Sequence, residues 1–393
     1  GLSANTAYTL SAKARNAASV ETSASEITRY TSQNTPTSIS FSGTGATSVT
    51  ATANGTFTNQ GAGSSSLAFN NGAGTTQSVT SGAAWTNTGL TPNTSYTYTV
   101  YAANGDGDQT SSVQGSVVTL AAAPGALTVN GPAATTMNVA ISDVSSNPAS
   151  TQFAIYEIGT GNYVQANGTL GASAAWQTNA AWGTVTVSGL SVNNPYQFKV
   201  KARNSENTET SFSSNSSIVY TLANTPAAPT LADATTSGMT ITVNENSNPS
   251  DVTYSIQETL QSKYVQADGT LGASAAWQTK SAWGTLILTG LSSSTLHTFT
   301  VTARNGDLVS TSASSAASLS TTSSSSGSSR PHSQSSSSSS STSTTSSASS
   351  TSSTSSTTST TSTTSGATTP ATSTTTVTAP ATFTSLTQIR DFI

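Results

Sequence analysis

The sequence contains no cysteine, and it is also poor in histidine and in charged residues. Without thiols the chain has no disulfide, no thiolate nucleophile, no Cys-ligated zinc and no iron–sulfur cluster. Its two histidines, His297 and His332, lie in a predicted strand and in a Ser/Thr-rich tract, so no His-based catalytic triad or metal site is expected. The sequence therefore predicts neither a metal ion nor another cofactor.

Charge is scarce: 7% of the residues are charged and the formal net charge is −4. A nucleic-acid-binding surface needs a basic stripe, which this sequence lacks, so nucleic acid is not an expected partner. No apolar run reaches the ~20 residues of a membrane span. The acidic residues are scattered, and Glu157 and Glu258 occupy equivalent strand positions in two repeats, where we expect them to face solvent. No paired-carboxylate site is expected, and the chain is not expected to be an enzyme.

The segment Asn104 to Asp108 places oxygen-bearing side chains at alternate positions, as a calcium-binding loop does. It lacks the closing bidentate glutamate of such loops. Asn-Gly and Asp-Gly are also the commonest tight turns between antiparallel strands. We favour the turn, with calcium as the alternative.

One pattern recurs four times and organises the rest of the chain. A leucine is followed six residues later by an aromatic or histidine ring, and then apolar residues alternate with polar ones up to an asparagine. This alternation is typical of a half-buried β-strand that is entered through a turn. The four copies run from Leu2 to Asn16, Leu90 to Asn104, Leu190 to Asn204 and Leu291 to Asn305.

The copy from Leu90 to Asn104 resembles the corner and following strand of fibronectin type III domains. The resemblance implies a seven-stranded antiparallel sandwich of the immunoglobulin-like kind, and a tyrosine corner whose hydroxyl bonds back to the main chain. The corner role falls to Tyr8, Tyr96 and Tyr196, and His297 departs from it. A second departure is that Met137 and Met239 occupy the region where the family usually carries a tryptophan.

The repeats predict an all-β chain of tandem sandwiches. Residues 1–32 read as the C-terminal part of a truncated domain, because the sequence opens directly on a corner motif, and we expect a fragment of a longer protein. Complete domains are expected at 36–121, 124–222 and 226–321. The joins contain prolines, which stop a sheet and stiffen a link. In the most divergent domain, at 36–121, Trp85 is expected in the core.

The third and fourth units are near copies of each other. The segment 163–178 returns at 264–279, 101 residues later, with Asp268 in place of Asn167. Duplicates this similar suggest a tandem expansion in which each unit builds its own core.

The composition changes sharply after the fourth unit, where residues 322–380 are mostly Ser and Thr. Such a tract buries nothing that could offset its ordering entropy, so a disordered stalk is predicted. It is either a spacer that lifts the domains off a surface or an expandable linker. At 381–393 apolar residues return at three- to four-residue spacing, which predicts the start of a truncated helical segment.

Paired tryptophans are the candidate binding residues. Counting back from Val185, strand alternation would expose Trp182, and an exposed indole can stack on a sugar ring. Gly183 intervenes, however, and a bulge there would turn Trp182 inward. Core packing is the favoured reading and contact with a carbohydrate or another partner is the alternative, for the four residues Trp176, Trp182, Trp277 and Trp283.

These features favour a non-catalytic extracellular protein, of a bacterial surface or secreted type by composition. Its sandwiches would space and present binding surfaces to a protein or polysaccharide at a cell surface. The alternative is an accessory region of a secreted polysaccharide-degrading enzyme whose catalytic domain lies outside this sequence. Fold alone does not decide between them, because common folds host many functions.

Overall fold

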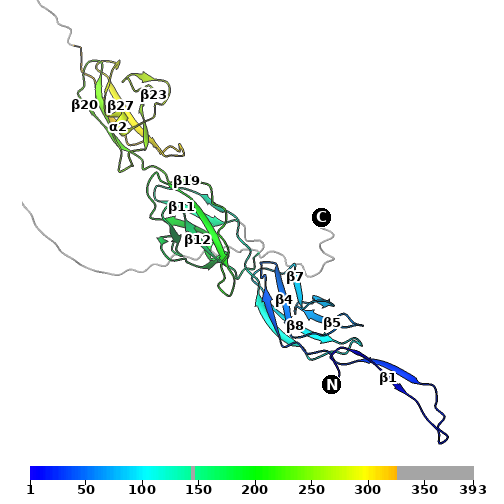
Figure 1. The fold of residues 1–393 in the computed structure, drawn as a ribbon. Coiled ribbons are helices and arrows are strands. Elements are labelled where there is room, and N and C mark those ends of the chain that lie inside the picture. The colour runs from blue at the N-terminus through cyan, green and yellow to red at the C-terminus, as the bar shows by residue number, and fades with distance from the viewer. Residues whose placement is uncertain (143–146, 325–393) are drawn as a thin grey trace, which may run out of the picture. The chain divides into compact units, whose positions relative to one another are not determined.

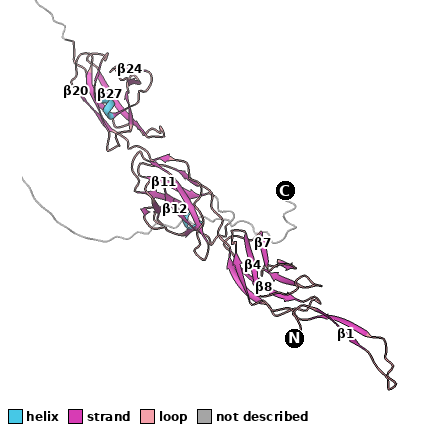
Figure 2. Ribbon diagram, in the orientation of Figure 1, coloured by secondary structure: helices cyan, strands magenta, loops and turns pink. Residues whose placement is uncertain are grey.

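The computed structural model describes residues 1–142 and 147–324, and within them the chain is almost entirely antiparallel β-structure (Figures 1 and 2). The helices in these ranges are two single turns, α1 (Asn179–Trp182) and α2 (Lys280–Trp283). The expected tandem all-β sandwiches are confirmed. Nearly all of the Ser/Thr-rich tract at 322–380, and the helical segment expected at 381–393, lie outside the described residues.

The first unit is a single hairpin of β1 (Ala7–Ala12) and β2 (Ser25–Tyr30), drawn in dark blue in Figure 1. Leu10 and Ile27 lie opposite each other and are 65% and 51% exposed. The hairpin therefore has no core of its own.

The second sandwich packs a three-stranded sheet on a four-stranded one. The first sheet is β3 (Ser38–Ser42), β4 (Ser48–Asn54) and β7 (Ala84–Thr88). The second is β6 (Thr76–Val79), β5 (Ser66–Asn70), β8 (Ser95–Ala103) and β9 (Val113–Val118). Trp85 is buried between them, with its ring centroid 5.7 Å from that of Tyr98, so its predicted core position is confirmed.

The third sandwich repeats this plan with shorter outer strands. One sheet is β10 (Leu127–Asn130), β11 (Thr136–Ile141) and β16 (Thr184–Ser188). In the other, β12 (Gln152–Glu157) pairs with β13 (Asn162–Val164), β15 (Gln177–Thr178) and β18 (Phe198–Arg203), and β13 pairs with β14 (Leu170–Gly171). A short pair of β17 (Pro195–Tyr196) and β19 (Val219–Tyr220) closes it.

The fourth sandwich has the same layers. Its first sheet is β20 (Ala227–Ala232), β21 (Met239–Asn244) and β26 (Thr285–Leu288). Its second is β24 (Leu271–Gly272), β23 (Lys263–Val265), β22 (Thr253–Glu258), β27 (Leu296–Arg304) and β28 (Ala317–Ser320), with β25 (Gln278–Thr279) paired to β22.

Each sandwich encloses a separate apolar core, as the strand pattern dictates. In β18, Phe198, Val200 and Ala202 are fully buried and the residues between them are half-buried, because successive side chains point to opposite faces of a sheet. Met137 and Met239 are also buried core residues. The cores belong to separate clusters, so each sandwich is stabilised mainly by its own two sheets.

At each predicted corner, the side chain of the tyrosine or histidine contacts the main chain five residues earlier in the sequence. The Tyr196 hydroxyl accepts a hydrogen bond from the Ser191 N–H at 2.8 Å, and the Tyr96 hydroxyl accepts from Thr91 at 2.9 Å. The Tyr8 hydroxyl accepts from Ser3 at 3.1 Å in the exposed hairpin. These bonds hold the loop between the two sheets at the start of the central strand.

The fourth corner is different because an imidazole replaces the phenol. His297 Nε2 lies 3.4 Å from the Ser292 carbonyl oxygen, the longest of the four corner contacts. Its Nδ1 lies 3.4 Å from Oε1 of Glu258, and both residues are buried. His297 thus occupies the corner position in the sequence. Its ring lies beside a buried carboxylate, and it does not accept a hydrogen bond from a main-chain N–H as the tyrosines do.

Replacing Tyr196 by phenylalanine should destabilise the third sandwich by about 1–2 kcal/mol, because the Ser191 N–H loses its acceptor. Hydrogen exchange of the β12 and β18 amides would measure the change. The control is Tyr156→Phe in the same sandwich, where a half-buried ring without a corner bond should change the free energy of unfolding by less than ~0.5 kcal/mol. Equal effects of the two substitutions would contradict the corner's role.

Candidate functional site

The third sandwich carries a concentration of cations and aromatic rings on one sheet face. Lys199, Lys201 and Arg203 alternate along β18 with the core residues, so all three side chains lie on the outer face. The register of the sheet then sets what lies beside them. Tyr156 on β12 is directly opposite Lys199, and Tyr163 on β13 is directly opposite Tyr156.

The rings of this face pack on one another. The centroids of Tyr156 and Tyr163 are 5.0 Å apart in an edge-to-face arrangement, and Phe212 lies 5.4 Å from Tyr156. Aromatic pairs at these separations attract one another beyond the area they bury. The result is a half-buried aromatic platform.

The cations lie over these rings. Lys199 Nζ is 4.4 Å from the Phe212 centroid, and the Arg203 guanidinium carbon is 4.5 Å from the centroid of Trp176. Lys201 Nζ is 5.4 Å from the same Trp176 centroid and 2.6 Å from Oε2 of Glu209. Such contacts hold long cationic side chains in place at a modest gain of ~0.5–1 kcal/mol each at exposed sites.

The Lys201 ammonium stays charged. Burial is the largest influence on it and lowers its pKa, but the hydrogen bonds to Glu209 and Tyr163 outweigh burial, so the pKa is raised above the usual lysine value. The face thus carries three cations, Lys199, Lys201 and Arg203, and one carboxylate, Glu209, which is paired with Lys201. The formal net charge of the whole chain is −4.

We call this set the cationic aromatic face: Tyr156, Tyr163, Trp176, Lys199, Lys201, Arg203 and Phe212. It can accept carboxylate or sulfate groups on its cations and stack flat apolar surfaces on its rings. It offers no activated nucleophile and no acid–base pair. Its chemistry is that of binding.

The fourth sandwich lacks most of this face despite its near-copied sequence. The equivalents of Tyr156, Lys199, Lys201 and Phe212 are Gln257, Thr300, Thr302 and Ala313. The Arg–Trp contact is kept, with the Arg304 guanidinium carbon 4.5 Å from the Trp277 centroid. The fourth sandwich is thus a natural comparison in which the scaffold stays and the face changes.

The structure separates the four candidate tryptophans into two pairs. Trp176 and Trp277 are half-buried beneath their arginines. Trp182 and Trp283 are each 4% exposed, and their Nε1–H groups donate at 2.9 Å to the carbonyl oxygens of Phe153 and Tyr254.

The inward turn of Trp182 has a local cause. A single helical turn, capped by the Thr178 hydroxyl, ends at Trp182, and Gly183 follows with φ of 51°, a conformation that glycine adopts readily. The chain therefore changes direction at Gly183, and the alternation of side chains along β16 does not extend to Trp182. Trp182 and Trp283 present no ring to a ligand, whereas Trp176 belongs to the cationic aromatic face.

The expectation that Glu157 and Glu258 face solvent is wrong, because both are fully buried. The Glu157 carboxylate accepts hydrogen bonds from the N–H groups of Gly159 and Thr160 and from the Thr160 hydroxyl. A carboxylate with this many donors can be buried at the end of a strand. Both residues order the following turn, and they lie in different sandwiches.

The Asn104–Asp108 segment is a turn that also reaches the preceding unit. Asn104 Oδ1 accepts from the N–H groups of Asp106 and Asp108, which closes the turn. Asp106 Oδ2 accepts from the Tyr30 N–H of the hairpin at 2.8 Å. The oxygens are therefore engaged in structure. Within the described residues no three acidic or histidine side chains cluster as metal ligands do.

Two asparagines recur at every junction between units. One lies three residues after the corner leucine and has a positive φ, which asparagine tolerates better than most residues. The other ends the central strand of the following unit. All six are less than one-tenth exposed, and we call them the junction asparagines: Asn5, Asn93 and Asn193, with Asn104, Asn204 and Asn305.

Between the third and fourth sandwiches, Asn193 Oδ1 accepts from the Gly306 N–H at 2.8 Å, and Asn305 Nδ2 donates to the Thr221 carbonyl at 3.1 Å. The two amides thus cross the junction in opposite directions. The same exchange occurs at the other junctions, through Asn93 with Ser205, Asn204 with Thr119, Asn5 with Gly105, and Asn104 with Tyr30 and Thr31.

The linker that leads into each sandwich is also held. Asn248 donates to the carbonyl of Asn224 and accepts from its N–H, at 2.8 and 2.7 Å. Asn147 makes the same reciprocal pair with Ala122. Both linkers are therefore hydrogen-bonded to the sandwich that they enter.

Side-chain size is matched across the junctions. A Cβ on Gly306 would lie 2.3 Å from the Tyr220 ring, and one on Gly105 would lie 2.4 Å from the Tyr30 ring. At the middle junction, Ser205 corresponds to the glycines and Val118 to the tyrosines. The larger serine thus faces the smaller valine, and the glycines face the larger tyrosines.

The fourth corner lacks the junction asparagine. Ser294 occupies the position of Asn193, again with a positive φ, and the sequence beyond this sandwich is Ser/Thr-rich instead of another such repeat. Asparagine is thus found at this position in the three units that are followed by a sandwich.

Sequence reasoning named Trp176 but missed the lysines, the arginine and the junction asparagines. A usable signal was present in each case. Cations at alternate positions of one strand lie on the same face of the sheet. Asparagine at the same two positions of successive repeats, where the strand pattern does not call for it, indicates a contact outside the repeat.

The substitution Gly306→Ser should disturb the third junction, because the new side chain meets the Tyr220 ring. Overpacking of this kind costs about 1–3 kcal/mol. Faster hydrogen exchange of the amides at 222–225, with unchanged exchange in both cores, would report a loosened junction. Adding Tyr220→Val, which recreates the natural Val118–Ser205 combination, should restore slow exchange; failure to restore it would contradict the size matching.

No family model and no curated protein matches this sequence. Among solved structures, the crystal structure of chicken CNTN1 FN1-FN3 domains is 14% identical, with a TM-score of 0.27, covering 73% of this chain and 98% of its own. The two-domain fibronectin type III segment from chicken tenascin is 13% identical, with a TM-score of 0.33, covering 50% and 99%. The sheet order and corner bonds described above make the chain a tandem of antiparallel β-sandwiches, and these two structures are what it is similar to.

Proposed function

We propose that the chain is a non-catalytic extracellular array that spaces its sandwiches and presents the cationic aromatic face to a partner at a cell surface. The observation that carries the proposal is the repetition of the junction asparagines at all three junctions. In this proposal the domains keep the boundaries 36–121, 124–222 and 226–321, and the Ser/Thr-rich residues 322–380 serve as the stalk.

The junctions suit a structural role because the asparagines that form their hydrogen bonds are buried. A buried donor or acceptor that loses its partner costs about 1–3 kcal/mol, so separating two units is opposed at several atoms at once. An array coupled in this way transmits force and keeps a binding face in a defined relation to its neighbours. No helix in the described part of the chain is long and apolar enough to cross a membrane.

The partner that fits the cationic aromatic face is an acidic polysaccharide. Its carboxylates would pair with Lys199, Lys201 and Arg203. The Tyr163 and Trp176 rings, over which Lys201 and Arg203 lie, would hold these cations in place for the polymer. The excess of cations lies on an otherwise acidic chain, so complementary charge selects the anionic polymer.

An accessory role in a polysaccharide-degrading enzyme would use the same face, since both roles need a polysaccharide partner. The two differ in what the complete reading frame encodes. A domain with paired catalytic acids would favour the enzyme, and a wall-binding or anchoring module would favour the surface array.

The double variant Lys199→Thr/Lys201→Thr places on the third sandwich the residues that the fourth already carries at Thr300 and Thr302. We expect the Kd for polygalacturonic acid to rise by about tenfold, since two charge-assisted contacts are lost. Binding of the wild-type chain should also weaken as salt is added, because exposed charges are screened. Surface plasmon resonance with the immobilised polymer measures both.

The matched control is Lys13→Thr/Lys263→Thr, which removes the same charge from exposed positions outside the face. Its Kd should stay within about twofold of wild type, a difference of less than ~0.5 kcal/mol. If the control weakens binding as much as the double variant does, net charge and not the face accounts for binding. If the wild-type chain does not bind the polymer, the partner is wrong.

A further inference from the structure

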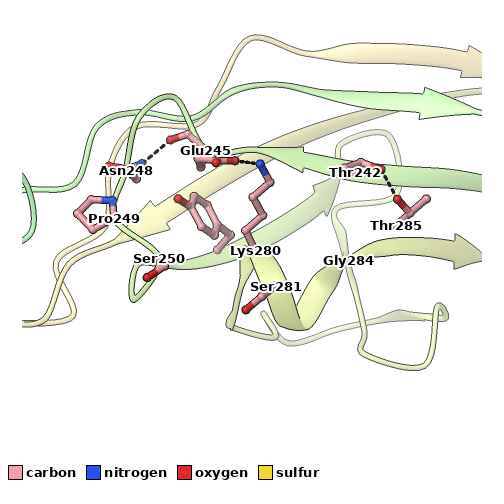
Figure 3. A pocket seen from close by; sticks show the side chains of 10 residues that line it. Thr242, Glu245, Asn248, Pro249, Ser250, Lys280, Ser281, Gly284 and Thr285 are labelled. Atoms are coloured by element: carbon pink, nitrogen blue, oxygen red, sulfur yellow. Dashed lines mark hydrogen bonds and ion pairs between the residues drawn. The ribbon is translucent and has the colours of Figure 1, made fainter.

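A pocket of about 530 Å³ opens on the fourth sandwich, between the loop from β21 to β22 and the start of β26 (Figure 3). Thr242 on β21, Ser250 in the loop, and Lys280 and Ser281 on α2 all line it. The size is within the usual range of about 300–1,000 Å³ for small-ligand sites.

An ion pair spans one wall of the pocket. Lys280 reaches across from α2 to the Glu245 carboxylate, as Figure 3 shows, and the two side chains are 44% and 34% exposed. The hydrogen bond from Lys280 lowers the pKa of Glu245, which keeps the carboxylate ionised. An ammonium has three donor protons and a carboxylate has two acceptor oxygens, so both groups can bind a further partner without separating.

The Tyr254 hydroxyl is buried beside this wall without a hydrogen-bond partner among the described residues, and Tyr254 is 1% exposed. The nearby Asn248 amide is already engaged, because its nitrogen donates to the carbonyls of Asn224 and Glu245 and its oxygen accepts from Asn224. Buried polar groups in native proteins are nearly always paired, so an orphaned hydroxyl at a pocket calls for an explanation.

Tyr254 is available as a donor at all physiological pH values. Burial raises its pKa to about 12, against a smaller opposing effect of the Asn248 side chain. The hydroxyl therefore keeps its proton and can give it to an oxygen that enters the pocket.

The third sandwich shows that the fold does not require these polar groups. Thr242, Ser250, Tyr254, Lys280 and Ser281 replace Ala140, Ala149, Phe153, Asn179 and Ala180. The equivalence of Thr242 and Ala140 is fixed by pairing, since they lie opposite Thr285 and Thr184. Within the same two repeats, 163–178 and 264–279 differ at one position. The two repeats thus differ in the hydrogen-bonding side chains around this pocket, while the neighbouring segment is nearly identical in both.

The geometry points to a binding site for a neutral, polyhydroxylated ligand, a single sugar residue, held by Tyr254, Lys280 and Glu245. A sugar hydroxyl both donates and accepts, so adjacent hydroxyls can accept from Lys280 and donate to Glu245. Another ligand oxygen accepts from Tyr254. The inference goes beyond the array function and does not depend on it.

The ion pair argues for a neutral ligand and against a charged one. Its two charges cancel, so the site does not attract an anion or a cation from a distance. A zwitterion such as an amino acid would compete with the ion pair, because its own carboxylate and ammonium would pair with Lys280 and Glu245 in place of each other. A hydroxylated ligand leaves their ion pair intact.

The test is a titration of the full chain with glucose, galactose, mannose and N-acetylglucosamine, each monitored through the NMR chemical shifts of residues in the fourth sandwich. We expect at least one of these sugars to saturate, with a Kd on the order of 1–10 mM, typical of a few hydrogen bonds in an open site. Tyr254→Phe should raise that Kd about fivefold and Lys280→Asn about tenfold, for loss of one neutral and one charge-assisted hydrogen bond.

Both variants install the residue found in the third sandwich, so the fold has already accepted them. Thermal unfolding gives a second readout: saturating sugar should raise the unfolding temperature of the wild-type chain more than that of Tyr254→Phe. No saturation by any of the four sugars, unchanged Kd values in both variants, or displacement of the sugar by glycine would each overturn the proposal. Binding of polygalacturonic acid should be unaffected by either variant, which separates this site from the cationic aromatic face.

Discussion

In β18, successive side chains point to opposite faces of the sheet, and this constraint governs both the core and the surface of the third sandwich. Phe198, Val200 and Ala202 fill the core, and the intervening Lys199, Lys201 and Arg203 must then lie together outside. Neither set can change its face without the other doing so, because a one-residue slip would reverse both. The corner bond of Tyr196 fixes the start of this strand, and with it the register.

The same strand links folding to assembly. The corner before it contains Asn193, three residues after Leu190, and Asn204 follows its last residue. Asn204 reaches the preceding sandwich and Asn193 reaches the following one. Each sandwich therefore contacts its neighbours through residues whose positions its own corner and central strand determine. A correctly folded unit presents its junction groups in place.

The sequence predicted the β-strands, the separate cores and the corner positions, because alternation and repetition report directly on a two-sided sheet. It wrongly predicted that Glu157 faces solvent. This carboxylate at the end of a strand can be buried because the N–H groups of the following turn point toward it, and strand alternation does not reveal that. It left Trp182 undecided because a single helical turn interrupts the parity on which counting relies. It did not identify the junctions either: the repeated asparagines mark two positions in each repeat, but only the structure shows which groups of the neighbouring unit they bind.

Comparison of the third and fourth sandwiches separates what the fold needs from what it carries. Both keep the corner position, the buried tryptophan and the Arg–Trp contact, which are the parts that hold the sheets. The third has cations and rings on its outer sheet face, where the fourth has threonine, glutamine and alanine. The fourth has hydroxyls and an ion pair around a pocket, where the third has alanine and phenylalanine. Polar groups that one duplicate carries and the other folds without are best explained by partners, and the two duplicates differ in where those partners would bind.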